Sequence, residues 1–138
     1  MKIFLRISVI LDGHYEVRNA DGEDRTMLLF HGTADGDYFH GEILPGGVDT
    51  QVQKKGELRR LSARYILSGE DFNGNTCKIF IENNGEVGED GKIRTCLQLF
   101  TDSKALKFLE EEKLTGTVVQ IPGGPLEIII GIETDTEK

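Results

Sequence analysis

Apolar and polar residues alternate along most of the chain with a period of two, which predicts β-strands rather than helices. The pattern is clear from the start of the chain: in residues 2–11 every second side chain is apolar and lies on the same face of the predicted strand. The same alternation returns in residues 58–68 and again in residues 126–134. The apolar side chains of these three faces are Ile3, Leu5, Ile7, Val9 and Leu11, then Leu61, Ala63 and Leu67, then Leu126, Ile128, Ile130 and Ile132.

Turn-forming residues divide the rest of the chain into further short strands. Glycine paired with Asp or Asn marks most of these turns, and 17 glycines are spread through the sequence. Pro45-Gly46-Gly47 is expected to end one strand and form a turn into the next, because proline lacks a donor and glycine accepts positive φ. The remaining predicted strands are residues 25–33, 38–44, 48–53, 77–82, 93–101 and 115–121.

Only residues 103–113 have a helical pattern. Ser103 is a suitable N-cap, and Ala105, Leu106, Phe108 and Leu109 form an apolar stripe. The acidic run Glu110–Glu112 lies near the C-terminal end, where the helix dipole disfavours negative charge. We therefore expect one short helix near 103–113.

About eight or nine strands, each with one apolar face, must close or stack to bury those faces. A closed or nearly closed antiparallel β-barrel of about eight strands removes the exposed sheet edges, and a β-sandwich is the second choice. No linker, repeat or low-complexity segment interrupts the chain, so residues 1–138 are expected to form a single all-β domain.

The charge of the chain restricts its partners. There are 24 acidic and 16 basic residues, a formal net charge of -8. This field repels nucleic-acid backbones and anionic membrane surfaces, so neither is an expected partner. The N-terminal apolar run is broken by Arg6 and ends at Asp12, which favours a strand of a cytoplasmic protein over a signal peptide.

The sequence lacks the motifs of common cofactor sites. No phosphate-binding loop or dinucleotide fingerprint is present. The two cysteines cannot form a zinc site by themselves, and the three histidines have no ligand spacing. We therefore expect neither a cofactor nor a metal.

Several stretches together resemble a known family. They are the residues 39–51 (FHGEILPGGVDTQ), 61–67 (LSARYIL), 70–74 (EDFNG), 79–85 (IFIENNG) and 94–100 (RTCLQLF). In order and spacing they resemble uncharacterised protein family 0311, also called domain of unknown function 3237. The resemblance covers nearly the whole chain and implies a barrel similar to the calycin and allene-oxide-cyclase-like barrels. It implies no assigned activity.

Two positions depart from the pattern of that family. Thr50 stands where the family usually has Trp, and Ser62 stands where it usually has Asp. A binding role that depends on the Trp ring is therefore not expected in this chain.

Polar residues near the glycine-rich turn are the first candidates for ligand contacts. Asp49 and Gln51 share one strand face and either orient a small ligand or stabilise the turn. Arg64 opposes the apolar face of its strand. It either pairs with Glu82 or Asp49, or binds a ligand carboxylate if the interior is polar there.

Two further candidates continue apolar faces. Tyr65 follows the face of Leu61, Ala63 and Leu67, and Asn83 follows the face of Ile79 and Ile81. A polar atom on an inward face needs a partner, which is either an internal hydrogen bond or a ligand.

Three functions remain open. The leading hypothesis is a barrel that binds a small, partly apolar molecule, because small barrels can hold one ligand. The second is a cyclase- or isomerase-type enzyme that uses these polar residues, and the sequence does not decide whether the protein is an enzyme. The third is a structural module that forms homo-oligomers.

Overall fold

The computed structural model describes residues 2–120 and 122–133, which form nine β-strands and one short 3₁₀-helix. The first five strands are β1 (Lys2–Arg18), β2 (Asp24–Asp35), β3 (Phe39–Ile43), β4 (Gly47–Gln53) and β5 (Arg60–Asp71). The chain continues through β6 (Thr76–Val87), β7 (Ile93–Thr101), the 3₁₀-helix η1 (Lys107–Glu111), β8 (Leu114–Gln120) and β9 (Leu126–Ile132).

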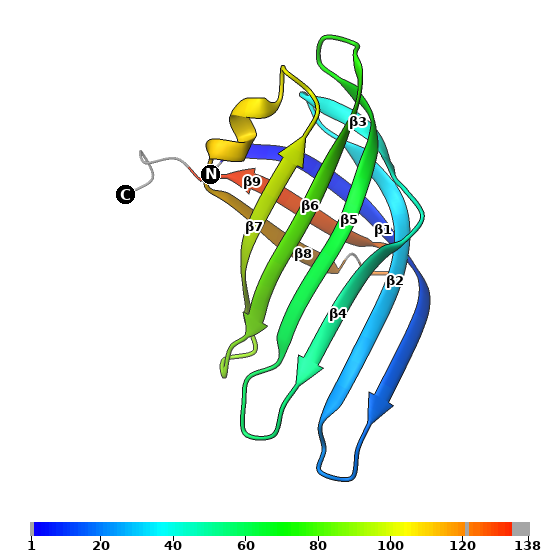
Figure 1. Cartoon of the computed structure of the whole chain (residues 1–138), viewed down its shortest axis with the longest axis vertical. Helices are drawn as coiled ribbons and strands as arrows, with labels where there is room; N and C mark the ends of the chain where they lie inside the picture. Colours follow the sequence, from blue (N-terminus) through cyan, green and yellow to red (C-terminus); the bar gives the residue numbers. More distant parts are fainter. Residues whose placement is uncertain (1, 121, 134–138) are drawn as a thin grey trace.

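The strands close into an antiparallel barrel, which confirms the fold expected from the alternation (Figure 1). Following the hydrogen bonds, the ring runs β1, β9, β8, β7, β6, β5 and then through β3 and β4 to β2, which pairs with β1 again. The ring has eight positions for nine strands, because β3 and β4 occupy one position in succession. The shortest strand pairing of the described ring is between β7 and β8, which pair through one residue pair, Leu97 with Leu114.

The Pro45-Gly46 segment ends β3 as expected, but it does not turn the chain back and is instead a bulge between two strands that run in the same direction. Both β3 and β4 run antiparallel to the same two neighbours, β2 and β5, and therefore point the same way. Along β2, Thr33 faces Glu42 and Phe30 faces Gly47, so two extra residues are inserted between the two registers. Gly46 absorbs the distortion with φ of 109°.

One end of the barrel is filled with apolar side chains. The fully buried residues of this core include Leu5, Ile7, Leu67, Ile79, Ile81 and Ile130. Two residues of the first strand depart from the expected inward face: Leu11 is 51% exposed, and Ile3 is 42% exposed whereas Phe4 is buried. A register irregularity between Ile3 and Leu5 switches the face, which sequence periodicity cannot reveal.

The element η1 covers this packed end of the barrel and replaces the helix expected over residues 103–113. Leu106 and Leu109 are fully buried, whereas Phe108 is 44% exposed. The buried pair has a spacing of three, and this spacing suits a 3₁₀-helix because residues i and i+3 are eclipsed there. Ser103 accepts a hydrogen bond from the Leu106 N–H at 3.2 Å, so it caps a tight turn instead of a longer helix.

Candidate functional site

A half-open cavity of about 100 Å³ lies inside the barrel, next to the apolar core. Most of its wall is apolar, and Leu11 and Val118, each about half exposed, lie at its open side. Three polar residues also line it: Asp49 from β4, Tyr65 from β5 and Asn83 from β6. An apolar wall with a few converging polar groups is the usual composition of a small-molecule site.

The three polar residues each bring one buried atom that has no hydrogen-bond partner among the described residues. These atoms are Asp49 Oδ1, the Tyr65 hydroxyl oxygen and Asn83 Oδ1. A buried polar atom without a partner costs free energy, and few native positions carry one. Three such atoms line one cavity, which makes this cavity the candidate functional site of the described residues.

Strand register explains why these atoms meet. Asp49 is paired with Ala63 across β4 and β5, and Ala63 is paired with Asn83 across β5 and β6. The three side chains thus form one row on the inner wall, with the small Ala63 between the two longer ones. Tyr65 follows two residues after Ala63 on the same face. Space for a ligand exists because Ala63 leaves it unfilled.

Tyr65 is held in the wall by its ring. The ring meets Phe30 edge to face, with 5.5 Å between the ring centres. Gly47 lies close beside Phe30: a Cβ at Gly47 would lie 3.0 Å from the Phe30 carbonyl oxygen and 3.2 Å from its ring. Burial raises the pKa of the Tyr65 hydroxyl well above its usual value of 10, so this group stays protonated at physiological pH.

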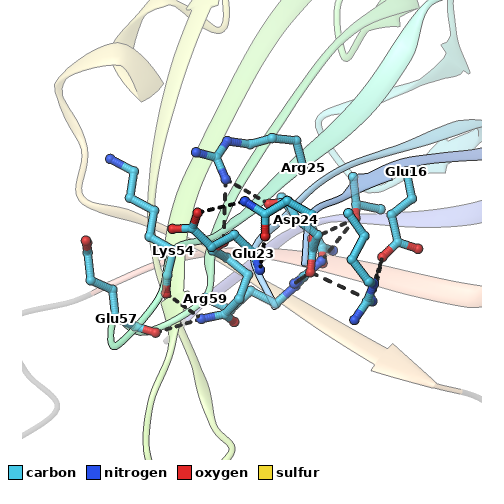
Figure 2. A network of polar contacts seen from close by, with 12 residues as sticks. Glu16, Glu23, Asp24, Arg25, Lys54, Glu57 and Arg59 are labelled. Atoms are coloured by element: carbon cyan, nitrogen blue, oxygen red, sulfur yellow. Dashed lines mark hydrogen bonds and ion pairs between the residues drawn. The ribbon is translucent and has the colours of Figure 1, made fainter. Parts of the chain in front are cut away.

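Gln51 does not line the cavity but connects Asp49 to a network of hydrogen bonds made by Arg59. Its Nε2 donates to Asp49 Oδ2 at 2.9 Å, and its Oε1 accepts from Arg59 Nε at 2.7 Å. Arg59 also donates to Asp24 Oδ2 at 3.0 Å and to the Thr26 hydroxyl at 3.3 Å. Figure 2 shows Arg59 and Asp24 within this group of contacts.

Arg59 and Asp24 were not recognised from the sequence. The hydrogen bond from Arg59 lowers the pKa of the Asp24 carboxyl, which is 5% exposed and remains charged inside the barrel end. A signal for Asp24 existed: with Thr26, Leu28 and Phe30 it shares one face of β2 at a period of two. Arg59 precedes β5 and reaches the network from the β4–β5 connection, which periodicity could not predict.

Arg64 does not join the cavity. Its side chain is 61% exposed on the outer wall and lies 3.3 Å from Glu82, its cross-strand neighbour. A ligand carboxylate held by Arg64 inside the barrel is therefore incompatible with the structure. Thr50 and Ser62, the two departures from the family pattern, face each other on the outer wall beside the groove there.

The other grooves are weaker candidates for a ligand site. A larger groove of about 610 Å³ crosses the outer face of β4, β5 and β6, but none of the three unpartnered atoms faces it. Within residues 2–120 and 122–133, no cluster of three or more His, Cys, Asp or Glu side chains is arranged to hold a metal ion. No helix in this described part is long and apolar enough to cross a membrane.

Comparison with known proteins places the chain in a family. The family model described as "Protein of unknown function (DUF3237)" matches residues 1–132. The chain belongs to this family. A relative from Clostridium acetobutylicum, described as a UPF0311 protein, is 36% identical over 64 residues, which is 46% of this chain and 38% of that relative. The aligned part is thus well under half of the relative's length.

Solved structures share the fold of this DUF3237 chain. A protein of unknown function from Clostridium acetobutylicum has a TM-score of 0.76 at 23% identity, covering 96% of this chain and 95% of its own. A β-barrel-like protein from Acinetobacter baumannii has a TM-score of 0.68 at 17% identity, with coverages of 96% and 94%. A protein from Penicillium herquei described as an enzyme has a TM-score of 0.72 at 14% identity, with coverages of 96% and 92%. At these identities the likeness establishes the fold alone.

Proposed function

We propose that this barrel binds one small, partly apolar molecule in the cavity lined by Asp49, Tyr65 and Asn83. The observation that carries the proposal is the convergence of three buried polar atoms without partners on one cavity. A purely structural interior would pair these atoms or replace them with apolar groups, because each unpaired atom costs about 1–3 kcal/mol. A ligand that supplies hydrogen-bond partners removes that cost when it binds.

The size of the cavity is consistent with such a ligand. Its volume of about 100 Å³ is somewhat smaller than the roughly 150 Å³ of an apolar cavity known to bind benzene. The open side allows part of a larger molecule to extend past Leu11 and Val118 toward solvent. The expected ligand is therefore about one ring in its buried part.

Native mass spectrometry of the protein purified from its own host tests the proposal. We expect a reproducible added mass on the folded wild-type chain, which disappears on denaturation. The variant Ala63→Leu fills the space between Asp49 and Asn83 and is expected to lose this added mass. The matched control Ala20→Leu makes the same change at an exposed turn position and is expected to keep it.

Two results would count against binding in this cavity. One is an added mass that survives in Ala63→Leu at the wild-type level while that variant remains folded. The other is the absence of any added mass together with a wild-type crystal structure whose cavity is filled by rearranged side chains.

A second candidate is catalysis of the cyclase or isomerase type in the same cavity. It is favoured by a protonated Tyr65 hydroxyl and an Asp49 carboxylate oxygen that face one space, because general acid–base chemistry needs a donor and an acceptor together. The Penicillium herquei protein with this fold is described as an enzyme, and this supports the second candidate by analogy of fold alone. Conversion of the co-purified molecule into a product of equal mass and different retention time, by wild type but not by Asp49→Asn, would support it.

A further inference from the structure

The orientation of Asp49 is set by a chain of hydrogen bonds that begins outside the cavity. A guanidinium group can only donate, so the Gln51 atom that Arg59 Nε meets at 2.7 Å must be the amide oxygen. The amide nitrogen of Gln51 therefore points the other way, toward Asp49 Oδ2 at 2.9 Å. Arg59 is itself held by Asp24 and Thr26, so the direction of the whole chain is determined by the ion pair between the partly exposed Arg59 and the buried Asp24.

This chain leaves Asp49 with one defined role toward the cavity. Its Oδ2 accepts from Gln51, and its Oδ1 is buried, unpartnered among the described residues and next to the cavity space. We infer that Arg59, acting through Gln51, holds Asp49 as a hydrogen-bond acceptor for the ligand. The ligand is therefore a small apolar molecule that carries a hydroxyl or N–H donor. This inference rests on the proposed function and names the chemical class of its ligand.

Other ligand classes fit the cavity less well. An anion would meet the Asp49 carboxylate and the Asn83 amide oxygen, while Arg64 lies outside and Arg59 donates to three protein partners. A molecule with only acceptor atoms can pair with the Tyr65 hydroxyl but leaves Asp49 Oδ1 unpaired. Sites built to pair a donor reject analogues that lack it, because a buried polar group then stays unsatisfied.

Three probes with the same six-membered ring test the ligand class: cyclohexanol, cyclohexanone and cyclohexanecarboxylate. Binding to the wild-type protein is followed by NMR titration of the methyl groups of Val118, Leu126 and Ile128, which line the cavity. We expect cyclohexanol to bind at least about tenfold more tightly than cyclohexanone, as a hydrogen bond to a charged acceptor implies. Cyclohexanecarboxylate is expected to cause no saturable shift.

The variant Asp49→Asn tests the directional role of Arg59. Because Gln51 still donates to position 49, the oxygen of the introduced amide must accept that bond, and its NH₂ group must turn toward the cavity. The preference should therefore shift from the alcohol toward the ketone. When Arg59→Met is added, the Gln51 amide is free to turn, and the shift toward the ketone should be lost.

A neighbouring arginine provides the matched control for this experiment. Arg60 lies on the outer surface, 3.8 Å from Glu57 and 3.9 Å from Glu86, and takes no part in the chain of bonds. Arg60→Met combined with Asp49→Asn should keep the shift toward the ketone. If Arg59→Met does not fold, Gln51→Leu breaks the same chain at its centre and leaves the pair of Arg59 and Asp24 in place.

The outcomes separate the inference from the proposed function. Equal binding of alcohol and ketone to the wild type would overturn the donor class and leave binding in the cavity intact. No saturable shift of the cavity methyl groups with any probe would overturn both. A shift toward the ketone that survives in both the Arg59→Met and the Gln51→Leu backgrounds would overturn the role of Arg59.

Discussion

Removing the hydroxyl of Tyr65 should make the unliganded protein more stable, not less. Tyr65→Phe keeps the ring that packs edge to face on Phe30 and deletes an oxygen that is buried and unpartnered among the described residues. Tyr65 is 4% exposed, so water does not solvate this hydroxyl from the surface. In the unfolded chain the hydroxyl is hydrated, and folding therefore pays a desolvation cost that phenylalanine avoids.

The size of the effect follows from that cost. A buried polar group left without a partner costs about 1–3 kcal/mol, and we take the lower end, about 1 kcal/mol, because the cavity is half-open. An unfolding entropy of about 2.1 cal/mol/K per residue, applied to the whole chain, converts 1 kcal/mol into about 3–4 °C. The expected result is a Tm increase of this size in Tyr65→Phe.

Thermal unfolding followed by circular dichroism, on protein refolded from denaturant to remove any bound molecule, measures this change. Tyr38→Phe is the control, because the Tyr38 hydroxyl has a partner in the ammonium group of Lys2 and its removal should bring no gain. A decrease of the Tm by more than about 3 °C in Tyr65→Phe would refute the reasoning, since it would mean that the hydroxyl has a favourable partner in the empty fold. The same variant should bind the ligand more weakly, so stability and binding should change in opposite directions.

Three further predictions concern the rest of the barrel. The Ser103 hydroxyl and backbone N–H groups lower the pKa of the Asp71 carboxyl below its usual 3.8. The stability that this carboxylate contributes is therefore present above about pH 4 and is lost as the pH falls through the lowered folded-state pKa. In acid denaturation, Ser103→Ala should lose less stability between about pH 4 and pH 2 than the wild type. Gly69→Ala should destabilise the fold by about 1–3 kcal/mol in urea unfolding, because the added Cβ would lie 2.0 Å from a β3 carbonyl oxygen; an unchanged midpoint would contradict the close strand approach. One thiol per native chain, the exposed Cys96, should react rapidly with a disulfide reagent, whereas the buried Cys77, whose pKa is raised by burial, should react only after denaturation.

The regular part of the fold could be predicted because strand periodicity is a local property. Alternation in residues 126–132 identified Ile130 and Ile132 as inward, and both are buried. Local irregularities were less accessible. The face switch near Ile3 and the bulge at Pro45-Gly46 depend on how neighbouring strands align, so a short window of sequence does not distinguish a bulge from a turn.

Sequence patterns alone were enough to predict the family, the all-β class and the inward face that carries Tyr65 and Asn83. Which polar residues meet depends on the folded barrel, because partners on different strands are set by the strand register around the ring. Register brought Asp49 and Asn83 to either side of Ala63, whereas the outward position of Arg64 already followed from the alternation of its strand. The same closure brought Arg59 to Asp24 from 35 residues away, and the partial burial of this pair, which strengthens its interaction, arises only in the folded barrel.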